Sequence, residues 1–197
     1  MKYNKLRNTD IEVSEICLGT MTYGEQNSES EGHEQMDLAL DMGVNFFDTA
    51  ELYAVPSTKK NNGKTEEIIG TWFAKSGKRD KVILGTKVTG PSDNLKYISE
   101  DLGFSKDRMV DALEGSLKRL QTDYIDLYQL HWPQRNTNIF GTRGFPGIEG
   151  EDWHDENFKN ILETLDEFIK EGKIRSWGVS NETPYGTMRF IAEADKY

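Results

Sequence analysis

The chain alternates between short apolar runs and longer stretches in which apolar residues recur every three or four positions. Apolar runs stop at Gly19, Asp48, Lys87 and His131, and an amphipathic stretch comes after each of them. Short apolar runs predict buried strands, whereas a spacing of three and four predicts helices with one core-facing side. The pattern therefore predicts strands separated by helices, which is typical of a parallel sheet because parallel neighbours need a crossover connection.

A hairpin is predicted before the first of these strands, because segments 3–6 and 11–14 flank the turn-forming residues 7–10. The strands that follow are predicted at residues 16–18, 45–48, 82–87, 124–131 and 174–179. Helices are predicted at about residues 28–42, 68–76, 105–120 and 158–171, and a last one from residue 183 to the end at residue 197. The long loop 132–156 is rich in Gly, Asn and Pro, and such a loop is more often a lid or specificity loop than an idle connection.

The order of elements predicts a barrel. We expect one domain, residues 1–197, because this length supports a single core. The predicted fold is an α/β (β/α)8 TIM barrel with the N-terminal hairpin and about five of its eight βα units. An open doubly wound sheet is the alternative. Against it, no Gly-x-Gly-x-x-Gly sequence opens a helix after the first predicted strand.

Reactive side chains stand at the ends of three consecutive predicted strands. Asp48 ends the second strand, and Tyr53 comes five residues later. Lys87 ends the third strand and His131 the fourth. The carboxyl ends of barrel strands meet at one face, so we expect these side chains to form a single site. Because side chains alternate along a strand, Gln129 should share the inner face with His131.

The four side chains have complementary acid and base properties. A lysine ammonium beside Tyr53 would lower the tyrosine pKa by about 1 to 3 units, and Lys87 is the candidate. Asp48 would be the counter-ion that keeps a buried lysine charged. A neutral His131 could donate a hydrogen bond to a carbonyl oxygen. Such a site can polarise a carbonyl and deliver a proton, but a hydride-donating organic cofactor would have to bind beside it.

Composition narrows the classes of partner. The net charge of -10 disfavours a nucleic-acid surface, which needs clustered Lys and Arg. The single cysteine, Cys17, gives neither an internal disulfide nor metal-ligand spacing, and we expect it in the core. No segment reaches the roughly 20 apolar residues that span a bilayer. We therefore expect a cytoplasmic protein with no metal and with no nucleic-acid or membrane partner.

Three stretches resemble the signatures of a known family, the aldo-keto reductases. Residues 43–50 read GVNFFDTA, with EEIIG at 66–70, and the two later motifs are DYIDLYQLH at 123–131 and GKIRSWGVSN at 172–181. On these motifs the chain is identified as a member of the family, and it is most similar to the bacterial Tas-type branch. The family's last three barrel strands are not in the sequence, so we expect the chain to be C-terminally truncated relative to the family.

The resemblance implies an oxidoreductase that transfers a hydride from NADPH to an aldehyde or ketone. It implies Tyr53 as the proton donor, Asp48 and Lys87 as the pair that tunes it, and His131 as the residue that orients the carbonyl. Trp132 is implied as a wall of the substrate pocket. The residues that the resemblance places around the cofactor are Gly19, Thr20, Met21, Asp48, Ser180 and Asn181.

Other functions stay open at this point. Related barrels can be non-catalytic, cofactor-sensing or regulatory subunits, and a chain without the last strands could be an inactive fragment of a reductase. A Schiff-base aldolase that uses Lys87 is a further alternative, although an ion-paired lysine is a poor nucleophile.

Overall fold

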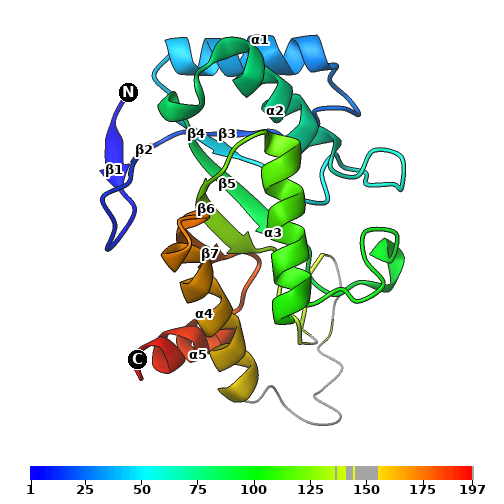
Figure 1. Ribbon diagram of the computed structural model, residues 1–197, viewed down its shortest axis with the longest axis vertical. Helices are drawn as coiled ribbons and strands as arrows, with labels where there is room; N and C mark the ends of the chain where they lie inside the picture. Colours follow the sequence, from blue (N-terminus) through cyan, green and yellow to red (C-terminus); the bar gives the residue numbers. More distant parts are fainter. Residues whose placement is uncertain (136, 141–143, 145–154, 197) are drawn as a thin grey trace.

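The computed structural model describes residues 1–135, 137–140, 144 and 155–196 (Figure 1). The N-terminal hairpin consists of β1 (Tyr3–Lys5) and β2 (Glu12–Ser14), which pair antiparallel as predicted. The remaining strands are β3 (Cys17–Gly19), β4 (Phe46–Asp48), β5 (Ile83–Val88), β6 (Ile125–Leu130) and β7 (Ile174–Val179). The helices are α1 (Glu29–Asp41), α2 (Lys64–Ser76), α3 (Lys106–Leu120), α4 (Asp155–Lys170) and α5 (Pro184–Ala194), with short 3-10 turns at Arg79–Lys81 and Asp93–Leu95.

Strands β3 to β7 form one parallel sheet in which the spatial order is the order along the chain. Consecutive helices also contact each other, from α1 with α2 to α4 with α5. A doubly wound sheet would reverse its strand order at a switch point, and this sheet does not. The arrangement confirms the predicted barrel, with the hairpin and five βα units present.

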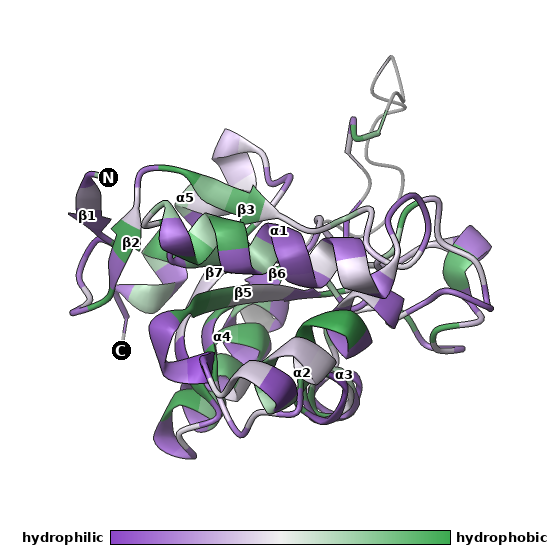
Figure 2. Ribbon diagram, turned by 90° about the horizontal axis from the view of Figure 1, so that it is seen from above, coloured by the Kyte–Doolittle hydropathy of each residue, from purple (hydrophilic) through white to green (hydrophobic). Residues whose placement is uncertain are grey.

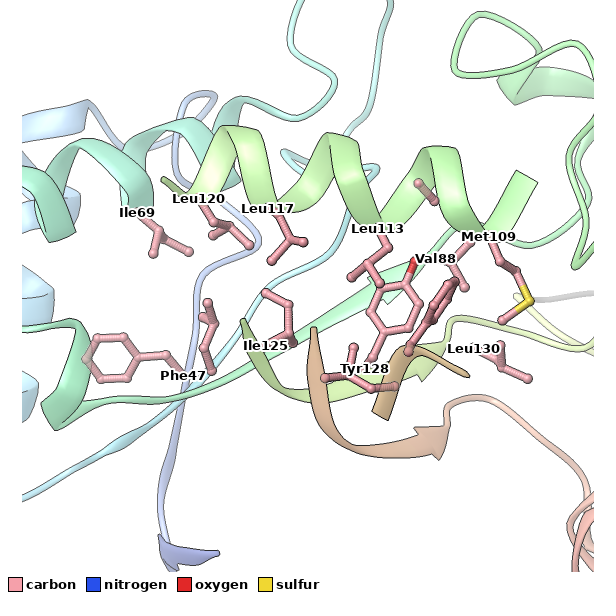
Figure 3. Close-up of a cluster of buried hydrophobic side chains, with 14 of the residues drawn as sticks. Phe47, Ile69, Val88, Met109, Leu113, Leu117, Leu120, Ile125, Tyr128 and Leu130 are labelled. Carbon is pink, nitrogen blue, oxygen red and sulfur yellow. The ribbon is translucent and has the colours of Figure 1, made fainter. Parts of the chain in front are cut away.

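Apolar residues fill the space between the helices and the outer face of the sheet. Figure 2 shows hydrophobic and hydrophilic segments alternating along α1 and α4, as the spacing predicts. Under α3, its predicted stripe packs onto β5 and β6 (Figure 3). Full burial of one such leucine contributes about 1.5–3 kcal/mol. The residues labelled in this cluster are Phe47, Ile69, Val88, Met109, Leu113, Leu117, Leu120, Ile125, Tyr128 and Leu130.

The helix boundaries follow local capping chemistry. Ser28 forms a capping box with Glu31 at the start of α1, and Ser105 accepts a backbone N–H at the start of α3. The last helix is shorter than predicted: α5 ends at Ala194, and the expected continuation to Tyr197 is wrong for Asp195 and Lys196. There the backbone N–H of Lys196 donates to the Glu193 carbonyl, which closes a tighter turn in place of a helical bond.

Cys17, on the inner face of the sheet, is exposed and is not part of the core, so the expectation for this residue is wrong. In the parallel register Cys17 stands beside Phe46, and Gly19 two residues on stands beside Asp48. These positions share the inner face, opposite to the helix-covered Phe47. A short apolar run shows that a strand is buried on one side, but it does not show what covers the other side.

Candidate active site

Lys87 and Asp48 form an ion pair at the carboxyl ends of β4 and β5. The Lys87 ammonium donates to Asp48 Oδ2 and to the Thr49 carbonyl oxygen, each at 2.7 Å. The Lys87 side chain is 6 % exposed, so these partners compensate its buried charge. Gln129 lies on the same face, as predicted, and its amide donates to Asp48 Oδ1 at 3.3 Å. The carboxylate is therefore held from two neighbouring strands.

The two remaining predicted residues meet this pair. The Lys87 ammonium lies 5.0 Å from the ring centroid of Tyr53. The Tyr53 ring meets the His131 ring edge to face, with centroids 5.6 Å apart and planes at 78°. The structure thus brings Asp48, Tyr53, Lys87 and His131 together at one end of the sheet.

Tyr53 reaches this position because the chain after β4 continues along β5 before it turns. The backbone N–H of Thr49 donates to Gly85 and that of Glu51 to Lys87. The Tyr53 N–H then closes a turn onto the Ala50 carbonyl at 3.1 Å. The phenol is half-buried at the end of this extension.

The ionisation of Tyr53 differs from the expectation. Burial, followed by the charge of Asp48, raises the pKa of Tyr53 to about 12. The expected lowering of this pKa is therefore wrong in its net direction: Lys87 is paired with Asp48, and desolvation of the phenolate together with the charge of Asp48 decides the shift. The pKa of His131 is lowered to about 3, first by burial and then by the charge of Lys87. Both groups are neutral at neutral pH.

Neutral Tyr53 and His131 are both hydrogen-bond donors. An alkoxide formed from a carbonyl is a stronger base than a phenolate, so a phenol with a raised pKa still protonates it. The neutral imidazole has one N–H with which to polarise a carbonyl oxygen. Among the residues described, its Nδ1 has no hydrogen-bond partner. The arrangement can therefore orient and protonate a carbonyl oxygen.

The loop after β3 contains three predicted cofactor residues, which lie in different surroundings. Gly19 is exposed, and a Cβ built on it would have no heavy atom within 4 Å. Thr20 is fully buried, and its hydroxyl donates to the Asp48 carbonyl at 2.8 Å, so it fixes the end of β4. Met21 is exposed, and its carbonyl accepts the N–H of Val55 in the loop beyond Tyr53.

Ser180 and Asn181 follow β7 beside the end of β6. The amide of Asn181 donates to the His131 carbonyl at 2.9 Å and to the Ser180 hydroxyl at 3.1 Å. The Asn181 backbone has φ 52°, which turns the chain sharply. Within the described part of the chain, no hydrogen bond uses Asn181 Oδ1. An amide oxygen and a hydroxyl complement both halves of a carboxamide, so these residues fit the nicotinamide end of the expected cofactor.

The indole ring of Trp132 lies next to the imidazole ring of His131, with ring centroids 4.8 Å apart. Its side chain is buried, and the indole N–H donates to the Pro91 carbonyl at 3.0 Å. Gly90 makes room for the indole, since a Cβ there would lie 2.5 Å from Trp132 Nε1. Trp132 is therefore placed to support His131. Most of the loop 132–156, which we expect to be a lid or specificity loop, lies outside the described residues.

The described residues contain no group of three or more His, Cys, Asp and Glu that could hold a metal ion. None of the helices among them combines the length and apolar character needed to cross a membrane.

Several known proteins are similar to this chain over nearly its whole length. The chain is 48% identical to Protein tas of Escherichia coli over 202 aligned positions, which cover all of the chain and 57% of the relative. It is 39% identical to the uncharacterized oxidoreductase YrpG of Bacillus subtilis, of which it covers 54%. The solved aldo-keto reductase AKR11C1 of Bacillus halodurans, in its holo form, superposes with a TM-score of 0.72 at 31% identity. That alignment covers 98% of the chain and 54% of the solved protein.

The chain thus spans a little more than half the length of the curated relatives that it matches over its whole length. Residues 15–197 match the Aldo/keto reductase family, so the match includes every strand of the parallel sheet and all of the predicted site residues. The chain belongs to the aldo/keto reductase family of oxidoreductases.

Proposed function

We propose that this chain, as one domain of residues 1–197, contains the carbonyl-reducing site of an NADPH-dependent reductase that acts on aldehydes or ketones. The observation that carries the proposal is the Lys87–Asp48 ion pair beside the neutral rings of Tyr53 and His131. A charged pair next to two neutral donors is what protonation of a developing alkoxide needs.

Each residue has a role that follows from its surroundings. His131 and Tyr53 both donate hydrogen bonds to the substrate oxygen, and Tyr53 then gives up its proton to that oxygen. The ammonium of Lys87, 5.0 Å from the ring centroid, stabilises the phenolate that is left. Asp48 compensates the buried charge of the Lys87 ammonium and holds it in place. NADPH, when bound, supplies the hydride that reduces the carbonyl carbon.

The residues proposed to hold the nicotinamide lie at the two edges of the sheet. Ser180 and Asn181 would hold the carboxamide next to β6, and Gly19 and Met21 would line the opposite side, with Asp48 between them. Thr20 contributes through Asp48, whose carbonyl it binds. The choice of NADPH over NADH rests on the family resemblance. Location in the cytoplasm is likewise a proposal, supported by the single cysteine.

The aldolase alternative is disfavoured by the bonding of Lys87. Its ammonium donates to both a carboxylate and a carbonyl, whereas a Schiff-base lysine must lose its proton to attack. Borohydride reduction in the presence of an aldehyde should leave no adduct on Lys87, and a trapped adduct would support the aldolase. A regulatory role without catalysis would leave Tyr53 dispensable, so substitution of Tyr53 separates that role from the reductase.

The proposal is tested with the purified 197-residue chain. NADPH is titrated by fluorescence, and oxidation of NADPH is then followed with a panel of aldehydes and ketones, for wild type and Y53F. We expect saturable binding in both proteins and turnover in wild type alone. Binding without turnover in wild type would favour the cofactor-sensing role, and a folded chain that binds no NADPH would favour an inactive fragment. A repeat with NADH tests the cofactor preference.

A further inference from the structure

A second buried ion pair lies next to the site, between Glu51 and Arg108. The Arg108 Nη2 donates to both oxygens of the Glu51 carboxylate at 2.7 Å. Each side chain is only 6 % exposed. The same carboxylate accepts the backbone N–H of Thr89 at 2.9 Å. Glu51 is therefore bound at once to the first turn of α3 and to the residue just after β5.

This pair is next to Tyr53 in the chain and next to Lys87 in space. Glu51 lies two residues before Tyr53, and its own N–H donates to the Lys87 carbonyl at 3.1 Å. Thr89, which binds the carboxylate, lies two residues after Lys87. Both the side chain and the backbone of Glu51 thus bind the end of β5, the strand that carries Lys87. Glu51 does so immediately before the turn that places the Tyr53 phenol.

The charges make the connection rigid. A buried arginine without its carboxylate is strongly unfavourable. Moving residues 49–53 away from α3 would therefore cost much free energy. Arg108 Nε and the Tyr128 hydroxyl are buried and have no partner among the residues described. Glu51 is therefore the carboxylate on which the buried guanidinium depends.

We propose that Glu51 and Arg108 are positioning residues that set the Tyr53 phenol relative to the Lys87 ammonium. Their pair fixes residues 49–53 against β5, so that the 5.0 Å separation of ring and ammonium is determined from α3. The catalytic meaning of this arrangement rests on the proposed role of Tyr53 as proton donor. The positioning itself is a matter of structure and can be measured without turnover.

A matched control exists in the pair Glu66–Arg119, which also joins a carboxylate, 0 % exposed, to a guanidinium on α3. Glu66 lies on α2, and its carboxylate accepts hydrogen bonds from Thr86 Oγ1 and Arg119 Nε but from no described residue of the segment 49–53. Substitutions at Glu66 therefore report the loss of a buried Glu–Arg pair that does not bind this segment.

The test uses the 197-residue chain labelled with 3-fluorotyrosine and observed by fluorine NMR at about pH 7. The Tyr53 resonance is identified by its loss in Y53F. The variants are E51Q, E51D and R108M, with E66Q and E66D as controls. E51D keeps the charge and the ion pair but shortens the side chain, so it tests the position even if the neutral variants do not fold. We expect the three site variants to shift the Tyr53 resonance, and the controls to lower stability without shifting it.

An unchanged Tyr53 resonance in E51D, or in folded E51Q and R108M, would overturn the proposal and leave the pair as a tie between α3 and the sheet. If the wild-type chain reduces aldehydes, E51D should lower kcat by up to about 100-fold with little change in KM, since misplacement by about 1 Å costs that much. If Y53F reduces aldehydes as well as wild type, the proposed function fails, whereas the resonance shift still decides whether the pair positions Tyr53.

Discussion

The Lys87 ammonium lies 2.7 Å from Asp48 Oδ2, and this contact joins the ends of two neighbouring strands inside the site. D48N removes the charge that compensates a buried ammonium, and Thr49 then offers only a neutral carbonyl. We expect the free energy of unfolding to fall by about 3 kcal/mol, at the low end for a broken buried pair because Asp48 is 29% exposed. Urea unfolding measures it.

The control for D48N is D80N, which breaks an ion pair between Asp80 and Lys81 whose side chains are both more than two-thirds exposed. An exposed pair contributes at most about 1 kcal/mol, so D80N should leave stability almost unchanged. Equal losses in the free energy of unfolding of D48N and D80N would show that burial does not increase the contribution of the Lys87–Asp48 pair to stability.

Tyr53 should be needed for proton transfer and not for folding. Its hydroxyl makes no hydrogen bond to another residue in the described ranges, so Y53F should change the free energy of unfolding by less than about 0.5 kcal/mol. Loss of the proton donor should reduce carbonyl reduction by about 100-fold or more. Steady-state kinetics and urea unfolding of the same preparations separate the two effects. Comparable turnover in both proteins would exclude Tyr53 as the donor.

His131 should make the protein sensitive to acid. Its pKa is lowered from 6.5 to about 3 in the folded state, so between these values the unfolded state binds more protons. The stability that neutral His131 provides is therefore complete above about pH 6.5 and is lost as pH falls toward about 3. H131Q should have a shallower fall, measured by urea unfolding at several pH values. Parallel curves for wild type and H131Q would contradict the burial argument.

Gly90 should be required by the indole of Trp132. In G90A the added Cβ would lie 2.5 Å from Trp132 Nε1, so the ring must move and lose its bond to Pro91. We expect a loss of about 1–3 kcal/mol from overpacking and a changed tryptophan emission spectrum. G103A is the control, because a Cβ at Gly103 meets atoms no closer than 3.7 Å. An unaltered spectrum in G90A would mean that the indole does not depend on this gap.

The sequence by itself predicted the elements and the four side chains of the site. Burial on one side of a strand or helix leaves a local periodicity, and the carboxyl ends of parallel strands meet at one face. For these reasons Asp48, Lys87 and His131 were recognisable at strand ends, with Tyr53 nearby. The α5 end was mispredicted because helical spacing alone does not show where a tighter turn takes over.

Only the tertiary structure decided how these groups are charged and held. The pKa of Tyr53 is raised by desolvation and by the charge of Asp48, and this shift has the opposite sign to the effect expected from Lys87 alone. Cys17 is exposed although it was expected in the core, because an apolar run does not reveal what covers the second face of its strand.

The partnership of Glu51 and Arg108 joins residues that are 57 positions apart. Arg108 does stand four residues before the buried Ala112, which places a charge at the edge of a core-facing stripe. Periodicity shows that this charge is close to the core, and a charge that is buried there needs an oppositely charged partner. It does not show which carboxylate comes to meet it, because that depends on how α3 packs against the ends of β4 and β5.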